Sequence, residues 1–167
     1  LFNITLLLIF LNSLQAIHLE PVHDAESELL QISGKDRKYH LLRDKPLEYE
    51  INGPKLLVIY LRKPVPKLEK DSIQINLQIQ LDDFNPYDFK TYRIPTVSVH
   101  SINHPVHHYT YSAKCLVQIP GGLHHVALTS TVSSPLLVRI VTKNKPRRNA
   151  GEVVKSRSVL LISFVLN

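Results

Sequence analysis

Cysteine occurs once in the sequence, so no disulfide can form within the chain. A chain of 167 residues can nevertheless bury a hydrophobic core as one domain, without a disulfide or a metal to support it. Cys115 alternates with Val117 and Ile119, so we expect it to lie buried as a small hydrophobic side chain. A reactive thiol would need an exposed, electropositive setting, which the neighbouring sequence does not supply.

Motifs that mark common catalytic and cofactor sites are also missing. The sequence has no Gly-x-Ser-x-Gly elbow, no His-Glu-x-x-His pair, no phosphate-binding loop and no dinucleotide fingerprint. A glycosidase needs two carboxylates at a defined separation, but Glu48 and Glu50 share one strand face and are as readily solvent-facing. We therefore expect a protein that is not an enzyme and that requires no cofactor.

No apolar run reaches the roughly 20 residues of a transmembrane helix, so the chain is not predicted to cross a membrane. Residues 1–16 carry no charge and combine the apolar run at residues 6–11 with a cleavage region ending at Ala16. This pattern is typical of a secretory signal peptide, so we expect export to the periplasm, the cell surface or the extracellular space. Export without disulfides favours a bacterial envelope. The alternative is a buried strand or short helix at the start of the domain.

Acidic residues are fewer than basic ones, and the net charge is +6. Six basic residues fall within residues 143–157, namely Lys143, Lys145, Arg147, Arg148, Lys155 and Arg157. Such a run either contacts phosphate, acidic lipid or acidic polysaccharide, or forms a solvated loop. No nucleic-acid-binding signature accompanies it, so we expect no nucleic-acid partner.

Alternation of apolar and polar residues is clearest at residues 72–81. The apolar positions are Ile73, Ile75, Leu77, Ile79 and Leu81, and the polar positions are Gln74, Asn76, Gln78 and Gln80. A strand sorts these side chains onto two faces, whereas a helix would mix them. Residues 47–51 and 56–61 are predicted to form two further strands, joined by a hairpin-like turn at Gly53–Pro54.

The remaining pattern is also one of short strands separated by turn residues, with Pro120–Gly121–Gly122 among the expected turns. The connections are too short for crossover helices, which favours antiparallel pairing. We therefore predict an all-β domain over residues 39–167, an antiparallel β-sandwich or jelly roll of about eight to ten strands. Residues 17–38 are predicted to be a polar N-terminal lead, either flexible or forming a helical turn or two after Asp24.

The order of these motifs resembles that of uncharacterised exported bacterial β-sandwich proteins. The resemblance runs over residues 39–142, through Gly53–Pro54, Arg62, the Ile119–Pro120–Gly121–Gly122 segment, His124 and a final Leu137–Val138–Arg139. It implies an envelope setting and a β-sandwich fold, and it implies no particular activity.

Aromatic and polar residues gather between residues 74 and 111 and suggest a binding surface. Tyrosine rings flanked by amides and carboxylates can stack on sugars while the polar groups bind hydroxyls. The candidate ligand-binding residues are Tyr87, Tyr92, Tyr109, Tyr111, Asp83, Asn85 and Gln78. The alternative is that the rings complete a hydrophobic core and that the amides form an ordinary solvated face.

Two segments have residue types that bind metals. Neutral imidazoles are good ligands for zinc, copper or nickel, and the candidate metal ligands are His100, His104 and His124. Residues 82–88 gather three carboxylates and an amide, a set of oxygen donors that could hold calcium. Solvated loop histidines and a turn rich in aspartate and asparagine are the alternatives. No cofactor beyond calcium or zinc is suggested.

These observations favour a non-enzymatic exported module that binds carbohydrate or another envelope polymer. An alternative is a structural or assembly subunit that forms homo- or hetero-oligomers, because the apolar edge strand expected at residues 159–166 invites pairing. A second alternative is a metal-binding protein that uses the histidine cluster.

Overall fold

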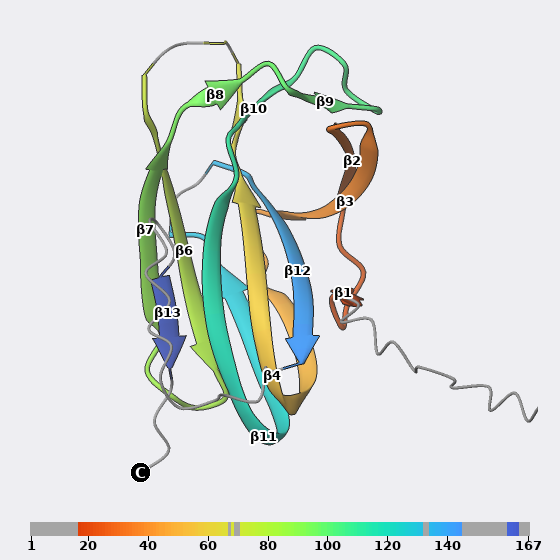
Figure 1. The fold of residues 1–167 in the computed structure, drawn as a ribbon. Coiled ribbons are helices and arrows are strands. Elements are labelled where there is room, and N and C mark those ends of the chain that lie inside the picture. Colours follow the sequence, from red (N-terminus) through yellow and green to blue (C-terminus); the bar gives the residue numbers. More distant parts are fainter. Residues whose placement is uncertain (1–16, 67, 69–70, 132–133, 145–159, 164–167) are drawn as a thin grey trace, which may run out of the picture.

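The computed structural model describes residues 17–66, 68, 71–131, 134–144 and 160–163. The predicted signal peptide and the basic residues from Lys145 to Arg157 lie outside these described residues. Every regular element of the described part is a β-strand, which confirms the all-β prediction (Figure 1). Within that part, no helix has the length and hydropathy that a membrane crossing requires.

The described strands form a large sheet and a small one. In chain order they are β1 (Ile17–Leu19), β2 (Ser27–Ile32), β3 (Lys35–Leu42), β4 (Leu47–Arg62), β5 (Pro64–Val65), β6 (Ile73–Leu81), β7 (Tyr87–Arg93), β8 (Pro95–Thr96), β9 (Val99–Ser101), β10 (His108–Thr110), β11 (Ala113–Thr129), β12 (Leu136–Asn144) and β13 (Leu160–Ser163). The large sheet has the order β7-β6-β11-β4-β12-β3-β2-β9, with β1 added on β12 and β13 on β11. The small sheet has the order β5-β10-β8.

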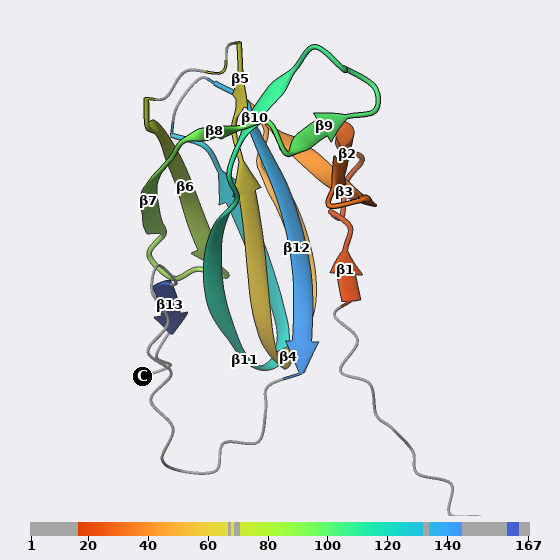
Figure 2. The same ribbon diagram turned by 45° about the horizontal axis from the view of Figure 1, so that its top comes forward.

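The long strands β4, β11 and β12 run side by side through the middle of the molecule (Figures 1 and 2). The small sheet lies at one end of them, and β2, β3 and β9 lie to one side. All pairings are antiparallel except that of β11 with β13. The antiparallel β-sandwich or jelly-roll class is thus confirmed. More strands are present than the eight to ten expected, because elements as short as β5 and β8 have no sequence periodicity of their own.

Alternation in β6 sorts the side chains as expected. Ile75, Leu77, Ile79 and Leu81 are buried in the main core together with residues of β4, β11 and β12. Cys115 is buried in the same core, and this burial raises the pKa of its thiol to about 12, so it is a packing residue as expected. A smaller core joins β2, β3, β9, β10 and β12.

The two segments expected to be turns are instead matched irregularities inside long strands. Gly53–Pro54 lies within β4 and Pro120–Gly121–Gly122 lies within β11, where Gly122 pairs with Gly53 and the register shifts. A Cβ atom on Gly53 would collide with the carbonyl oxygen of Pro120, and Gly122 has a φ of +111°. Glycine inside a strand often marks a bulge or a close backbone approach, and here it marks both.

The expectation of a helical turn or a flexible lead over residues 17–38 is wrong. Strands β1 and β2 and the beginning of β3 lie there, so the large sheet begins at Ile17. Strand β12 pairs with β1 at Ile140–Thr142 and with β3 at Leu136–Val138. Its partner strands are distant in sequence, and such long-range pairing leaves little local signal.

The expected apolar edge strand is described only at β13. Its backbone pairs with Cys115–Gln118 of β11 in the same chain, alongside the part of β11 that lies before the β6 pairing. This segment therefore has a partner within its own chain, and oligomerisation through residues 159–166 gains no support.

Candidate functional site

The four candidate tyrosines do not form one surface. Tyr109 is buried in the smaller core, and Tyr87 packs against the main core. Tyr92 and Tyr111 are 52% and 50% exposed. Tyr87 pairs with Ile79 and Tyr92 pairs with Gln74, so the two rings of β7 leave opposite faces of the sheet.

The outer side of the β6–β7 hairpin keeps part of the predicted ligand surface. We call it the amide face and define it by Gln74, Asn76, Gln78, Asp88, Tyr92 and the adjoining Thr129 of β11. Gln74 donates to Asn76 (2.7 Å) and accepts from the Tyr92 hydroxyl (3.1 Å). Gln78 donates to Asp88 (3.0 Å) and accepts from Thr129 (3.3 Å). The side chains of this face therefore hold one another in place.

A small surface hollow adjoins the amide face. Its polar lining comes from Lys63, Gln74, Asn76, Ser130 and Ser134. Lys63 also donates from Nζ to the backbone carbonyl of Gln74 (3.4 Å). The exposed ring of Tyr92 and the hollow are thus connected through Gln74, which contacts both. This arrangement can present hydrogen-bonding groups beside one aromatic ring.

Asp83 and Asn85 lie exposed on the connection between β6 and β7. The expected calcium cluster does not form there, because Asp82 is bound to β11 instead. Its carboxylate lies 2.7 Å from His124 Nδ1 and accepts a hydrogen bond from the backbone N–H of His125 (2.8 Å). Burial alone would raise the pKa of Asp82, but the hydrogen bonds from His124 and His125 outweigh burial and lower it.

The predicted histidine set is not brought together either. His124 contacts Asp82, while His104 contacts Glu28 and stacks on His107 with 4.8 Å between ring centroids. His100 lies exposed on β9, opposite Gln31. In the part of the chain that the structure describes, the one group of three potential metal ligands within reach of one another is formed by other residues.

His104 instead belongs to a cluster around Glu28, whose side chain is 12% exposed. Ser101 and Tyr109 donate their hydroxyls to Glu28 Oε1, and His104 Nδ1 lies 2.9 Å from both carboxylate oxygens. Burial would raise the pKa of Glu28, but the hydrogen bonds from Ser101 and His104 together lower it. The cluster joins β2, β9 and β10, and every partner of the carboxylate is a donor.

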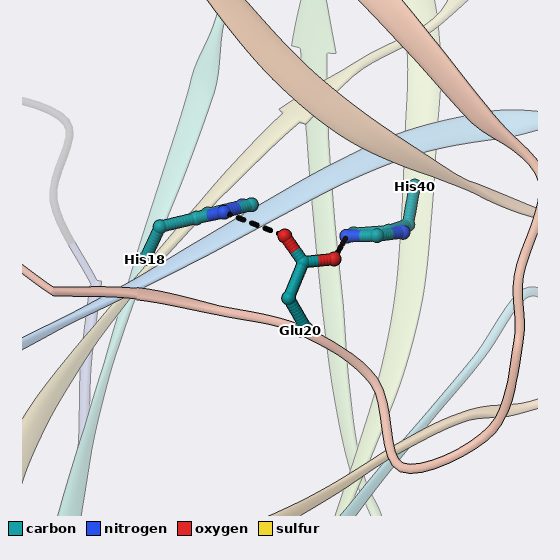
Figure 3. A group of neighbouring side chains, drawn as sticks. All are labelled: His18, Glu20 and His40. Carbon is teal, nitrogen blue, oxygen red and sulfur yellow. Dashed lines mark ion pairs between the residues drawn. The ribbon is translucent and has the colours of Figure 1, made fainter.

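The group that sequence patterns missed consists of His18, Glu20 and His40. Figure 3 shows the Glu20 carboxylate between two imidazole rings that are stacked with 5.9 Å between centroids. His18 Nδ1 lies 3.2 Å from Glu20 Oε1, and His40 Nε2 lies 2.9 Å from Glu20 Oε2. Potential ligand atoms of all three lie within 4.8 Å of one another.

Burial is distributed unevenly in this group. The His40 side chain is 3% exposed, whereas the Glu20 side chain is 53% exposed. Desolvation lowers the pKa of both imidazoles, against the opposing influence of Glu20, so they are neutral at neutral pH. A hydrogen bond from Lys38 (2.8 Å) lowers the pKa of Glu20. The one local signal was the His18-x-Glu20 spacing, which places both side chains on one side of an extended chain.

Comparison with known proteins gives no family assignment. No family model matches the chain, and no curated protein matches it significantly. Among solved structures, it is similar to an exo-β-1,3-galactanase from Phanerochaete chrysosporium, with a TM-score of 0.43 and 12% identity over 77% of this chain and 29% of the galactanase.

Two further similar structures are carbohydrate-active enzymes as well. A family GH115 4-O-methyl-α-glucuronidase with specificity for decorated arabinogalactans gives a TM-score of 0.39 and 10% identity over 76% of this chain and 18% of the enzyme. A ruminal GH26 endo-β-1,4-mannanase gives 0.34 and 11% over 71% and 21%. The chain spans less than a third of each of the three, and each activity is that of the enzyme named.

Proposed function

We propose that this protein is an exported, non-enzymatic β-sandwich module that binds carbohydrate through the amide face. The observation that carries the proposal is the half-exposed ring of Tyr92, joined by its hydroxyl to Gln74 in a row of hydrogen-bonded polar side chains. Aromatic rings cover the apolar faces of sugars, while amides and carboxylates bind hydroxyls.

Order within the amide face supports the proposal. Gln74, Asn76, Gln78 and Asp88 already hydrogen-bond to one another, so a ligand would immobilise few additional side chains on binding. Preorganisation of this kind lowers the entropic cost of association. The adjoining hollow offers further polar groups, including Lys63, to a sugar that extends beyond Tyr92. The site is shallow, which fits one or two sugar units of a longer polymer.

Export is part of the proposal and rests on the sequence of residues 1–16. Their uncharged, apolar composition before Ala16 is that of a signal peptide. An exported module of this kind would meet polysaccharides of an envelope or of the surroundings. The absence of catalytic motifs supports a binding role for such a module.

A glycan array with the purified protein, followed by titration calorimetry on the best ligand, tests the proposal. We expect Tyr92→Ala to weaken binding about fivefold to tenfold, because one aromatic stacking contact is lost. Tyr111→Ala is the matched control, since Tyr111 is equally exposed and has no hydrogen bond to the amide face among the described residues. Binding to no glycan, or equal losses in the two variants, would overturn the assignment to this face.

A further inference from the structure

We propose that His18, Glu20 and His40 form a binding site for a divalent transition metal ion, zinc above all, that links β1 to β3 beside β12. This site is separate from the amide face and from the histidines that the sequence singled out. It joins residues from the two strands that share one edge of β12, where His18 pairs with Val141 and His40 pairs with Val138.

The spacing of the donor atoms suits one ion. Ligand atoms about 2.0–2.2 Å from a tetrahedral zinc lie roughly 3.3–3.6 Å from one another. The separations of Glu20 Oε1 from His18 Nδ1 (3.2 Å) and of Glu20 Oε2 from His40 Nε2 (2.9 Å) are close to that range. Because the potential ligand atoms all lie within 4.8 Å, small side-chain rotations would bring three of them around one ion.

Buried nitrogen atoms without partners are the second, independent observation. Both ring nitrogens of His40 and Nε2 of His18 are buried with no hydrogen-bond partner among the described residues. His40 Nε2 is near Glu20 Oε2, but the two are not aligned as a hydrogen bond. A buried polar atom without a partner is costly, and a metal ion would compensate the imidazole lone pairs directly.

The chemistry of the donors selects the ion. Two neutral imidazoles and one carboxylate suit zinc, copper, nickel and cobalt, whereas calcium and magnesium prefer oxygen donors alone. Burial lowers the pKa of both imidazoles, which keeps them unprotonated and able to bind a metal at neutral pH. The exposed Glu20 provides a route for entry, and three protein ligands leave a fourth position for water or a small ligand.

Lys38 is the cation that a metal would have to replace. Its ammonium group lies 2.8 Å from Glu20 Oε2, the same oxygen that faces His40. A divalent ion bound between Glu20 and the imidazoles would carry more charge than Lys38 and would bring nitrogen ligands with it. We expect Lys38 to turn toward solvent when the metal binds, because its side chain is already 45% exposed.

Titration calorimetry with Zn²⁺ on the full chain, purified without a histidine tag and treated with a chelator, tests the site. We expect one ion to bind per chain, and affinity to fall at least about tenfold in His40→Gln and in Glu20→Gln. Glu20 is exposed, so its variant remains informative if His40→Gln fails to fold. His104→Gln is the control and should bind as the wild type does.

Two further readouts locate the ion. Co²⁺ should give the visible absorption of a four- or five-coordinate site in the wild type but not in His40→Gln. Zn²⁺ should slow amide hydrogen exchange in β1, because the ion would tie Ile17–Leu19 to β3. Binding of no Zn²⁺, binding that persists in both Glu20→Gln and His40→Gln, or loss of binding in His104→Gln would overturn the proposal.

Discussion

Two clusters of histidine and glutamate in this protein have opposite distributions of burial. Around Glu28 the carboxylate is 12% exposed and the imidazole of His104 is 52% exposed. Around Glu20 the carboxylate is exposed and the imidazole of His40 is buried. The same pair of residue types is therefore arranged in two inverse ways on neighbouring parts of one sheet.

The difference separates a structural contact from a binding site. Donors from Ser101, His104 and Tyr109 converge on Glu28, so its buried oxygens are satisfied. The buried nitrogens of His40 have no such partners in the described part of the chain. A satisfied buried group stabilises the fold, whereas an unsatisfied one costs stability unless something binds it.

The largest expected effect comes from breaking the structural cluster. Glu28→Ala should lower the free energy of unfolding by about 2–3 kcal/mol, because Ser101 and Tyr109 would lose a charged acceptor in a buried setting. Glu20→Ala should lower it by less than about 0.5 kcal/mol, since the Glu20 contacts are exposed to solvent. Urea denaturation with chelator present measures both. Equal losses would show that the two carboxylates do the same work.

The two clusters should also lose stability in different pH ranges. The pKa values of His18 and His40 are lowered from 6.5, so the unfolded chain takes up protons first and their contribution is lost as pH falls below 6.5. Glu20 opposes these shifts, while Lys38 and Arg139 add to that of His18. The pKa of Glu28 is lowered from 4.5, so its contribution is complete above pH 4.5 and is lost below it.

Urea midpoints of the metal-free protein from pH 8 to pH 3 test this separation. His40→Leu should reduce the decline that begins below pH 6.5, and Glu28→Gln should reduce the decline below pH 4.5. A wild-type profile that is flat between pH 6.5 and 5 would contradict the predicted histidine contribution.

These clusters also show the limits of sequence reasoning. The alternation in β6 depends on neighbours two positions apart, so its strand and its buried face could be predicted. His18 and His40 meet only because β12 pairs with both of their strands, and no local pattern encodes that pairing. Likewise, Gly53 and Pro120 have the composition of turns, and only their mutual packing makes them part of two continuous strands.

The predicted sugar-binding residues failed for a related reason. Composition groups Tyr87, Tyr92 and Tyr109, but the face on which each ring lies depends on strand register and on neighbouring strands. The alternation of Gln74, Asn76 and Gln78 was readable because it belongs to one strand, and this is the part of the site that remains.

A smaller effect should follow from removing the imidazoles. Without metal, His40→Leu should leave the free energy of unfolding unchanged or raise it by up to about 1 kcal/mol, because an apolar side chain replaces unpartnered nitrogens. His104→Leu should instead lower it by about 0.5–1 kcal/mol, because Glu28 loses one of its hydrogen-bonding partners. Thermal denaturation in chelator measures the pair, and a large loss in His40→Leu would place that histidine with the structural contacts.

The smallest change in stability, and the sharpest separation of stability from binding, is expected for Lys38→Gln. Lys38 and Glu20 are both about half exposed, so their contact should contribute less than about 0.5 kcal/mol to folding. Removal of the ammonium group would free Glu20 Oε2, and Zn²⁺ should then bind more tightly by a few-fold. Arg43→Gln is the matched control, because Arg43 makes an exposed contact with Glu26 (3.7 Å), a residue outside the group of metal ligands. Weaker Zn²⁺ binding in Lys38→Gln would mean that the lysine supports the ion and does not compete with it.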